Sequence, residues 1–87
     1  RLARLTTGQL NRVLQDAQDA HAATSSSGKS LRIYYGTQLR SDPPTFLIHV
    51  NDPKLAHFTY LRYLENSLRK VYPFTGTPIR IVLKARR

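Results

Sequence analysis

This 87-residue chain is strongly basic: 14 Lys and Arg residues oppose five Asp and Glu, which gives a formal net charge of +9. It contains no Cys, which excludes disulfide bonds and thiolate zinc sites and is compatible with the reducing cytoplasm, where we expect it to act. No stretch reaches the roughly 18 apolar residues that a membrane-spanning helix needs, and its length allows one domain with a thin core. The charge favours an anionic partner, with RNA or DNA ahead of a membrane surface.

The first predicted helix begins at Thr6 and fades near Ala22. Thr6 and Gln9 have the spacing of a capping box, and Leu5 and Leu10 have the spacing of a hydrophobic staple. Apolar residues then recur at helical intervals, at Leu10, Val13, Leu14 and Ala17. A polar, Ser-rich connection follows this helix.

The first predicted strand covers residues 31–38. Its period of two places Leu31, Ile33 and Tyr35 on one face. Gly36 inside the strand indicates a bulge or a close approach of another part of the chain.

The second predicted strand covers residues 45–50. Phe46, Ile48 and Val50 share one of its faces. Residues 41–44, with two consecutive prolines, turn the chain between the strands. We expect an antiparallel pair joined by a connection longer than a tight hairpin.

A second helix is predicted from Asp52 to about Tyr72. Asp52 suits the N-cap, and Pro53 suits the first helical position. Glu65 and Arg69 stand four residues apart in the favourable order. The apolar stripe of this helix is Leu61, Leu64, Leu68 and Val71.

The last predicted strand covers residues 79–84, after Pro73 stops the helix and residues 74–77 turn the chain. Ile79, Ile81 and Leu83 face one way along it. The element order is therefore α-β-β-α-β, which predicts an α+β fold with a three-stranded mixed sheet. One strand pair should be parallel because a helix joins the last two strands, whereas the strand order stays open.

No catalytic or metal site is predicted. The three histidines, His21, His49 and His57, fall in different elements without thiolates or clustered acids, and we interpret them as surface or partly buried residues. A glycine-rich phosphate-binding loop is also missing, so we expect that the chain by itself is no enzyme and neither binds nor hydrolyses GTP.

The tyrosines offer aromatic surfaces on which unpaired bases could stack. A Tyr beside an apolar stripe more often lies at the rim of the core with its hydroxyl at the surface. We interpret Tyr35, Tyr60 and Tyr63 in that way and leave the role of Tyr34 open.

The candidate RNA-binding residues are cations of the loop, the strands, the second helix and the tail. Arg69 and Lys70 also suit the end of a helix, whose dipole attracts positive charge. The tail places three cations within residues 84–87, which repel one another unless an anion lies near. The full candidate set is Lys29, Arg32, Arg40, Arg69, Lys70, Arg80, Lys84, Arg86 and Arg87.

The run from Tyr34 to Ile81 carries a family resemblance in three pieces: YYGTQ followed by PPTF, VNDP leading into RYLEN, and GTPIRI. It resembles the C-terminal KH-like domain of the Der (EngA) family of GTPases, which have two GTPase domains in tandem and act in ribosome assembly. The resemblance implies one KH-like domain over residues 1–87, with both helices packed on one face of the sheet. KH domains clamp nucleic acid with a GXXG loop, but no two of the four glycines here are three apart, so the clamp is absent, as it is in that family.

The same resemblance implies an accessory RNA- and ribosome-binding, regulatory domain. Its partners would be ribosomal RNA, the large ribosomal subunit and a GTPase domain of the same chain, with no membrane and with the fragment itself monomeric. The chain starts at Arg1 and contains no Met, so we expect it to be cut from a longer GTPase whose missing domains bind GTP and Mg²⁺. Two alternatives stay open: a module that chiefly docks on a GTPase domain, and a free-standing nucleic-acid-binding protein.

Overall fold

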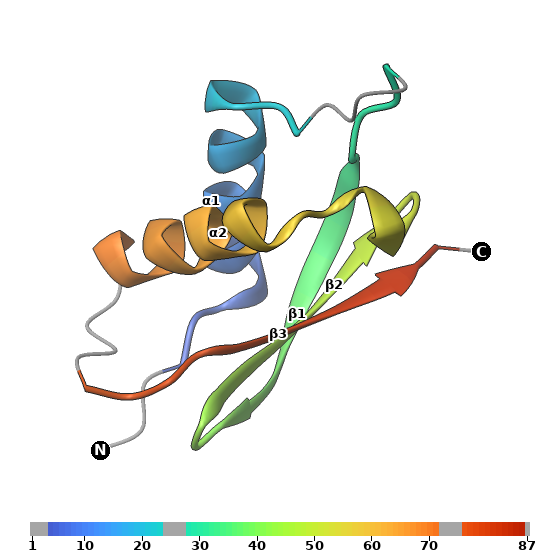
Figure 1. Ribbon diagram of the computed structural model, residues 1–87. Coiled ribbons are helices and arrows are strands. Elements are labelled where there is room, and N and C mark those ends of the chain that lie inside the picture. Colours follow the sequence, from blue (N-terminus) through green and yellow to red (C-terminus); the bar gives the residue numbers. More distant parts are fainter. Residues whose placement is uncertain (1–3, 24–27, 72–75, 87) are drawn as a thin grey trace.

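Two helices lie on one side of a three-stranded sheet (Figure 1). The computed structural model describes residues 4–23, 28–71 and 76–86. In chain order the elements are α1 (Thr7–Ala20), β1 (Ile33–Ser41), β2 (Pro44–Val50), the 3-10 turn η1 (Pro53–Leu55), α2 (Phe58–Val71) and β3 (Arg80–Ala85). This confirms the predicted α+β fold and its element order. Within the described residues, neither helix has the length and apolar character needed to cross a membrane.

The sheet has the strand order β1-β2-β3, with β2 in the centre. β1 and β2 are antiparallel, whereas β2 and β3 are parallel, which confirms the predicted parallel pair. The connection between β1 and β2 is shorter than predicted. Ser41 pairs with Pro44, so only Asp42 and Pro43, joined by a cis peptide bond, form the turn. The prediction was wrong because β1 continues past Gln38 instead of ending there.

Helix α1 forms as its sequence predicts. Thr6 Oγ1 accepts a hydrogen bond from the Gln9 backbone N–H at 3.1 Å, and Gln9 Oε1 accepts one from the Thr6 N–H at 2.9 Å. This capping box satisfies two backbone donors that the first turn leaves unpaired. Leu5 and the predicted stripe of α1 are buried in the core.

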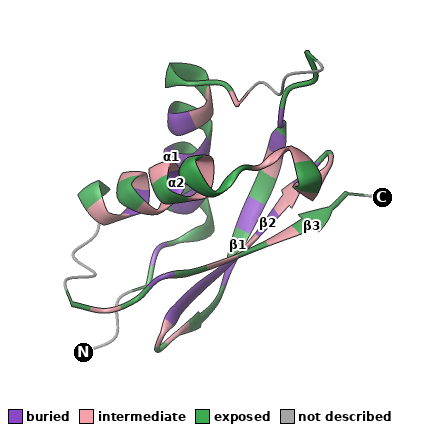
Figure 2. Ribbon diagram, viewed as in Figure 1, coloured by how far each residue is buried: buried purple, intermediate pink, exposed green. Residues whose placement is uncertain are grey.

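A bulge near the start of β1 changes which residues face the core. The pairing register with β2 shifts between Ile33 and Tyr35. Ile33, Gly36 and Gln38 are therefore buried, while Tyr35 is 46% exposed. The prediction that Tyr35 shares a face with Ile33 was wrong, because the extra residue of a bulge reverses the alternation that follows it. Figure 2 shows the resulting pattern of buried and exposed positions along the strands.

Amide side chains of α1 form hydrogen bonds with the backbone N–H and C=O groups of β1 that point away from β2. The Ile33 N–H donates to Gln18 Oε1 at 2.6 Å, and Gln15 Nε2 donates to the Ile33 carbonyl at 3.3 Å. Asn11 binds Gly36 in the same way. Because an edge strand otherwise presents unpaired backbone groups, these amides close part of the edge of the sheet.

Gln38 fastens the segment before α1 to the same strand. Its side chain is buried and accepts a hydrogen bond from the Leu5 N–H at 2.8 Å. The Gln38 carbonyl accepts a further bond from Arg4 Nη1 at 3.3 Å. The entry to α1 is thereby fixed to the far half of β1.

The second helix begins later than predicted. Asp52 does act as an N-cap, accepting a hydrogen bond from the Lys54 N–H at 3.0 Å, and Pro53 is the first residue that it caps. The capped element is only η1, because Ala56 has extended backbone angles and α2 starts at Phe58. η1 contacts β3, whereas α2 packs against α1.

The last turn of α2 also departs from the prediction. Leu64 and Leu68 are fully buried and Leu61 is half-buried, but Val71 is 55% exposed. The predicted helix end at Tyr72, the stop at Pro73 and residues 74 and 75 of the predicted turn lie outside the described residues.

The hydrophobic core lies between the helices and the sheet. Its largest fully buried side chains are Leu10, Leu14, Phe46, Ile48, Val50, Leu64 and Leu68. Strand β3 contributes the half-buried Ile81 and Leu83, and the residue just before it, Ile79, is buried, so the three predicted residues do face the core. The side chains that alternate with these core residues point to the opposite side of the sheet, which neither helix covers.

Candidate nucleic-acid interface

The side of the sheet away from the helices, here called the open face, is built from three cross-strand rows. The pairing register aligns the residues of each row from β1 through β2 to β3. The rows are Tyr35–His49–Lys84, Thr37–Leu47–Val82 and Arg40–Thr45–Arg80. Polar, aromatic, apolar and basic side chains thus meet on one surface.

Two of the candidate cations meet at the hairpin end of the open face. Arg40 and Arg80 lie 40 positions apart in sequence, yet both pair with Thr45 and line one surface hollow of about 380 Å³. Pro43 and Val82 also line this hollow. The sequence proposed both arginines, but the sheet register is what brings them together.

Negative charge is absent from the strands that form the open face. Asp16 and Asp19 belong to α1, and Glu65 belongs to α2. The remaining two acids, Asp42 and Asp52, lie in the hairpin turn and before η1. Lys84, Arg40 and Arg80 are all exposed, so this surface favours an anionic ligand.

Arg86 continues the basic surface beyond the end of β3. Its guanidinium carbon lies 4.5 Å from the centroid of the Tyr34 ring, and its backbone N–H donates to the Val50 carbonyl at 2.8 Å. The cation–π contact holds an exposed Arg over the start of β1. The role of Tyr34, which the sequence left open, is therefore to pack against the Arg86 guanidinium. Arg87 lies outside the described residues.

Lys29 and Arg32 lie before β1, at the opposite end of that strand from Arg40. Both side chains are exposed. The Arg32 backbone N–H donates to Asn51 Oδ1 at 2.8 Å, and its side chain lines a surface hollow shared with Tyr34. This hollow is lined also by Gln15, Gln18 and Asp19 of α1, so Arg32 lies beside the helix and is separated from the Arg40–Arg80 hollow by the length of β1.

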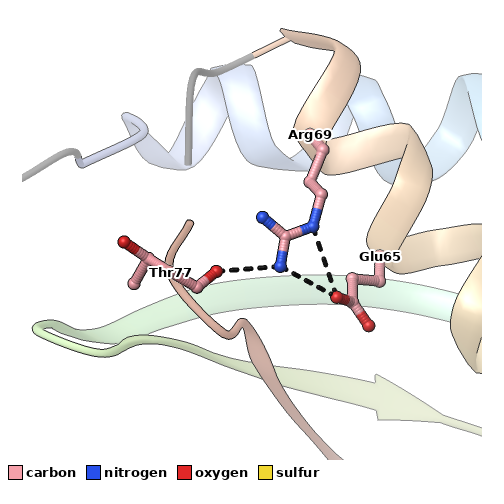
Figure 3. A network of polar contacts seen from close by, with 3 residues as sticks. All are labelled: Glu65, Arg69 and Thr77. Carbon is pink, nitrogen blue, oxygen red and sulfur yellow. Dashed lines mark hydrogen bonds and ion pairs between the residues drawn. The ribbon is translucent and has the colours of Figure 1, made fainter. Parts of the chain in front are cut away.

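Arg69 and Lys70 belong to the helical layer and not to the open face. Arg69 Nη2 donates to Glu65 Oε2 at 3.0 Å and to the Thr77 carbonyl at 2.8 Å, so its guanidinium links α2 to the segment that enters β3 (Figure 3). Lys70 is exposed beside a groove between α1 and α2, lined also by Ala17. The predicted Glu65–Arg69 pair is confirmed, and it serves the fold.

Tyr35 and His49 form an aromatic pair on the open face that the sequence did not reveal. Their ring centroids are 4.3 Å apart and their planes are inclined by 17°. The assignment of Tyr35 to the core rim was wrong, because the bulge turns its side chain away from the core. Gly36 was the available signal, since a bulge beside it implies that Tyr35 changes face.

Tyr60 and Tyr63 lie at the rim of the core, as predicted. The Tyr60 hydroxyl donates to the His21 carbonyl at 2.9 Å, and the Tyr63 hydroxyl donates to the Ala17 carbonyl at 2.7 Å. Both bonds reach carbonyls near the end of α1: the His21 carbonyl belongs to the C-cap residue, and the Ala17 carbonyl also accepts the His21 backbone N–H at 3.1 Å. Burial, and secondarily the neighbouring Tyr63, raises the pKa of Tyr60 above its ordinary value of 10.0.

The histidines do not assemble a metal site. Across residues 4–23, 28–71 and 76–86, no group of three or more His, Cys, Asp or Glu side chains is placed to hold a metal ion. His21 packs edge-on against Tyr63 with centroids 5.4 Å apart, while His49 lies on the open face. His49 Nδ1 is buried and has no hydrogen-bond partner in the described structure.

A family model described as "KH-domain-like of EngA bacterial GTPase enzymes, C-terminal" matches residues 4–84. The chain belongs to this family. The KH-like domain is 50% identical over 84 residues to a protein named GTPase Der from Limosilactobacillus reuteri and 52% identical to its namesake from Limosilactobacillus fermentum. A GTPase Der from Listeria monocytogenes is 45% identical. Each alignment covers 97% of the KH-like domain but 19% of the relative, so the chain spans about a fifth of the length of these curated relatives.

Proposed function

We propose that this KH-like domain is the accessory RNA-binding and regulatory part of a Der-type GTPase that acts in assembly of the large ribosomal subunit in the cytoplasm. GTP and Mg²⁺ would be bound by GTPase domains outside this chain. Membership of the EngA family supports the connection to a GTPase. The observation that carries the RNA contact is the basic open face, on which Arg40, Arg80 and Lys84 gather without a strand carboxylate.

The mode of binding follows from the chemistry of this face. Arginine guanidinium groups donate paired hydrogen bonds to phosphate oxygens, and each neutralised phosphate releases counterions. The domain lacks the GXXG loop with which other KH domains grip the nucleic-acid backbone. Its contact with ribosomal RNA would therefore depend on the placement of cations across the sheet.

A charge-matched pair of triple variants tests this proposal. The test variant replaces the three cations of the open face. The control replaces three exposed cations of α1, η1 and α2. Each variant replaces two Arg and one Lys, so both lose three positive charges. The test variant is Arg40→Gln, Arg80→Gln and Lys84→Gln; the control is Arg12→Gln, Lys54→Gln and Arg62→Gln.

The measurement is affinity for ribosomal RNA across a salt series. The test variant should bind more weakly than the control, and its dependence of log affinity on log salt should be shallower by about 0.7–0.9 per lost contact. An equal loss in both variants would move the contact away from the open face. No affinity of the unsubstituted domain, even at low salt, would overturn the proposed RNA contact altogether.

The docking alternative has one observation in its favour. Leu39 and Val82 are 53% and 46% exposed near the hairpin end of the sheet, where apolar area suits contact with protein. If a GTPase domain covers this area, adding the preceding GTPase segment should reduce RNA binding by the KH-like domain. Equal RNA binding with and without that segment would speak against docking there. The free-standing alternative has no such support, because the relatives are about five times longer than this chain.

A further inference from the structure

We propose that the open face holds an unpaired nucleotide of RNA by stacking its base on the ring of Tyr35. This inference rests on the proposed function and specifies it: the RNA segment engaged would contain an unstacked base, and not only a helical backbone.

The Tyr35 ring is supported on one side and open on the other. His49 lies against it at a centroid distance of 4.3 Å and an inclination of 17°, across the strand pair. β1 is an edge strand of the described sheet, so no other strand lies beyond Tyr35. The residue is 46% exposed. A base placed on the outer ring face would extend an existing stack of two flat rings.

The local backbone geometry accounts for this exposure. Without the register shift between Ile33 and Tyr35, strict alternation would have sent Tyr35 into the core with Ile33. The bulge instead puts a large aromatic side chain on the open face. Bulges of this kind commonly re-aim a side chain near a binding site.

Cations adjoin His49 and Tyr34, the aromatic neighbours of Tyr35, and would meet the phosphates of a bound nucleotide. Lys84 completes the row of Tyr35 and His49 on β3. Arg86, held 4.5 Å from the Tyr34 ring, lies where the tail passes the start of β1. Aromatic rings interleaved with cations, on strands without acids, are the arrangement that proteins use to bind single-stranded nucleic acid. A protein partner would need no such combination of stacking ring and cations.

An ordinary structural role for the Tyr35–His49 pair makes a different prediction. Cross-strand aromatic pairs stabilise a sheet, and in that case only stability would depend on Tyr35. A stacking site predicts in addition a preference for unpaired over duplex RNA, and this preference should require an aromatic ring at position 35. The two roles are therefore separable by measuring binding and unfolding on the same variants.

The test uses the 87-residue chain and a short single-stranded RNA carrying one 2-aminopurine, with a duplex of the same sequence for comparison. Tyr35→Leu removes the ring, and Tyr35→Phe keeps it. Phe58→Leu is the matched control, because Phe58 is an aromatic residue that is 69% exposed beside Arg62 and belongs to α2 and not to the sheet. Thermal unfolding of every variant is recorded, and binding is measured well below the lowest unfolding temperature.

We expect the wild-type chain to bind the single strand more tightly than the duplex and to change the 2-aminopurine fluorescence. Tyr35→Leu should weaken single-strand binding by at least about fivefold and abolish the preference, since one stacked base accounts for about 5- to 150-fold in affinity. Tyr35→Phe and Phe58→Leu should keep both properties.

Two results overturn the inference while leaving the proposed function intact. One is salt-dependent RNA binding that shows no preference for the single strand. The other is a Tyr35→Leu variant that binds RNA as the wild type does but loses affinity for the preceding GTPase segment, which would make this surface a protein contact. Absence of all RNA binding by the wild type would instead remove the proposed function, and this inference with it.

Discussion

Asn11 and Gly36 exchange two hydrogen bonds across the gap between α1 and β1. The Gly36 N–H donates to Asn11 Oδ1 at 2.8 Å, and Asn11 Nδ2 donates to the Gly36 carbonyl at 3.1 Å. One amide side chain thus satisfies both backbone groups of a buried glycine that point away from β2. The contact joins the helix to the bulged strand that presents Tyr35.

Replacing Asn11 by Ala should lower the free energy of unfolding by about 1–3 kcal/mol, because it leaves the Gly36 N–H and carbonyl without their partner. Urea denaturation monitored by circular dichroism measures this change. The neighbouring Arg12→Ala, at an exposed position of the same helix, should stay within about 0.5 kcal/mol of wild type. Equal stabilities of the two variants would mean that solvent replaces the Asn11 bonds.

A side chain at position 36 should be costly. A Cβ added to Gly36 would lie 2.7 Å from Leu14 Cδ1 and 3.4 Å from both Leu10 Cδ2 and the Leu47 carbonyl oxygen. Since Leu14 is itself fully buried, Gly36→Ala should destabilise the domain by about 1–3 kcal/mol through overpacking. Gly8→Ala is the control: its added Cβ meets nothing within 4 Å, and it should be neutral or stabilising by up to about 1 kcal/mol.

A double-mutant cycle tests whether the Leu14 side chain causes the destabilisation by Gly36→Ala. Leu14→Ala alone should cost about 2–5 kcal/mol as a large-to-small core substitution. Combined with Gly36→Ala, the total loss should be smaller than the two single losses added together, because the new methyl group occupies space that Leu14 vacates. Additive losses would place the strain of Gly36→Ala elsewhere.

Arg69 should matter for stability more than its ion pair alone predicts. Glu65→Ala removes a pair at i,i+4 spacing whose side chains are about one-third exposed, and it should cost at most about 0.5 kcal/mol. Arg69→Ala also removes the bond to the Thr77 carbonyl at 2.8 Å and should cost about 1–2 kcal/mol. Chemical denaturation measures the free energy of unfolding of both variants. Equal small decreases would show that the bond to the Thr77 carbonyl does not stabilise the fold. RNA affinity of Arg69→Ala should fall no more than that of another single exposed cation removed from the helices.

The raised pKa of Tyr60 predicts a loss of stability at alkaline pH. The unfolded chain ionises Tyr60 near pH 10 while the folded chain resists ionisation, so the unfolded state binds fewer protons above that pH. The contribution is therefore complete below about pH 10 and declines as the pH rises through the folded pKa. Tyr60→Phe should be less stable at neutral pH, having lost its bond to the His21 carbonyl, and should show a shallower decline above pH 10. A decline parallel to that of wild type would contradict the assignment to Tyr60.

The local signals of the sequence were sufficient for most elements of the fold. The capping box at Thr6, the stripe of α1 and the core face of β2 depend on neighbours within one or two turns, and all three are confirmed. The break between η1 and α2 was missed because Asp52 and Pro53 do start a helical element, but that element ends at Leu55. The length of the hairpin was missed for a related reason, since β1 continues by pairing with β2 up to Ser41.

The candidate site was only partly accessible from the sequence. Charge counting proposes arginines, but it cannot distinguish Arg80 on the open face from Arg69, which is bound to Glu65 and Thr77. That distinction comes from the packing of α2 against the segment before β3. Tyr35 was missed because a single inserted residue reverses the face of every following side chain, and the position of a bulge follows from pairing with another strand.

The hydrogen bond between the Leu5 N–H and the Gln38 side chain determines which element would first bear a pulling force applied at the N-terminal side of α1. Because the Gln38 side chain grips the backbone just before α1, a pull applied at Arg4 reaches β1 before it can unwind the first turn of the helix. β1 is paired with β2 from Ile33 to Ser41, so the force would be spread as shear over several hydrogen bonds at once. The chain at Arg4 and Leu5 is thus tied directly to the strand that bears Tyr35 and Arg40.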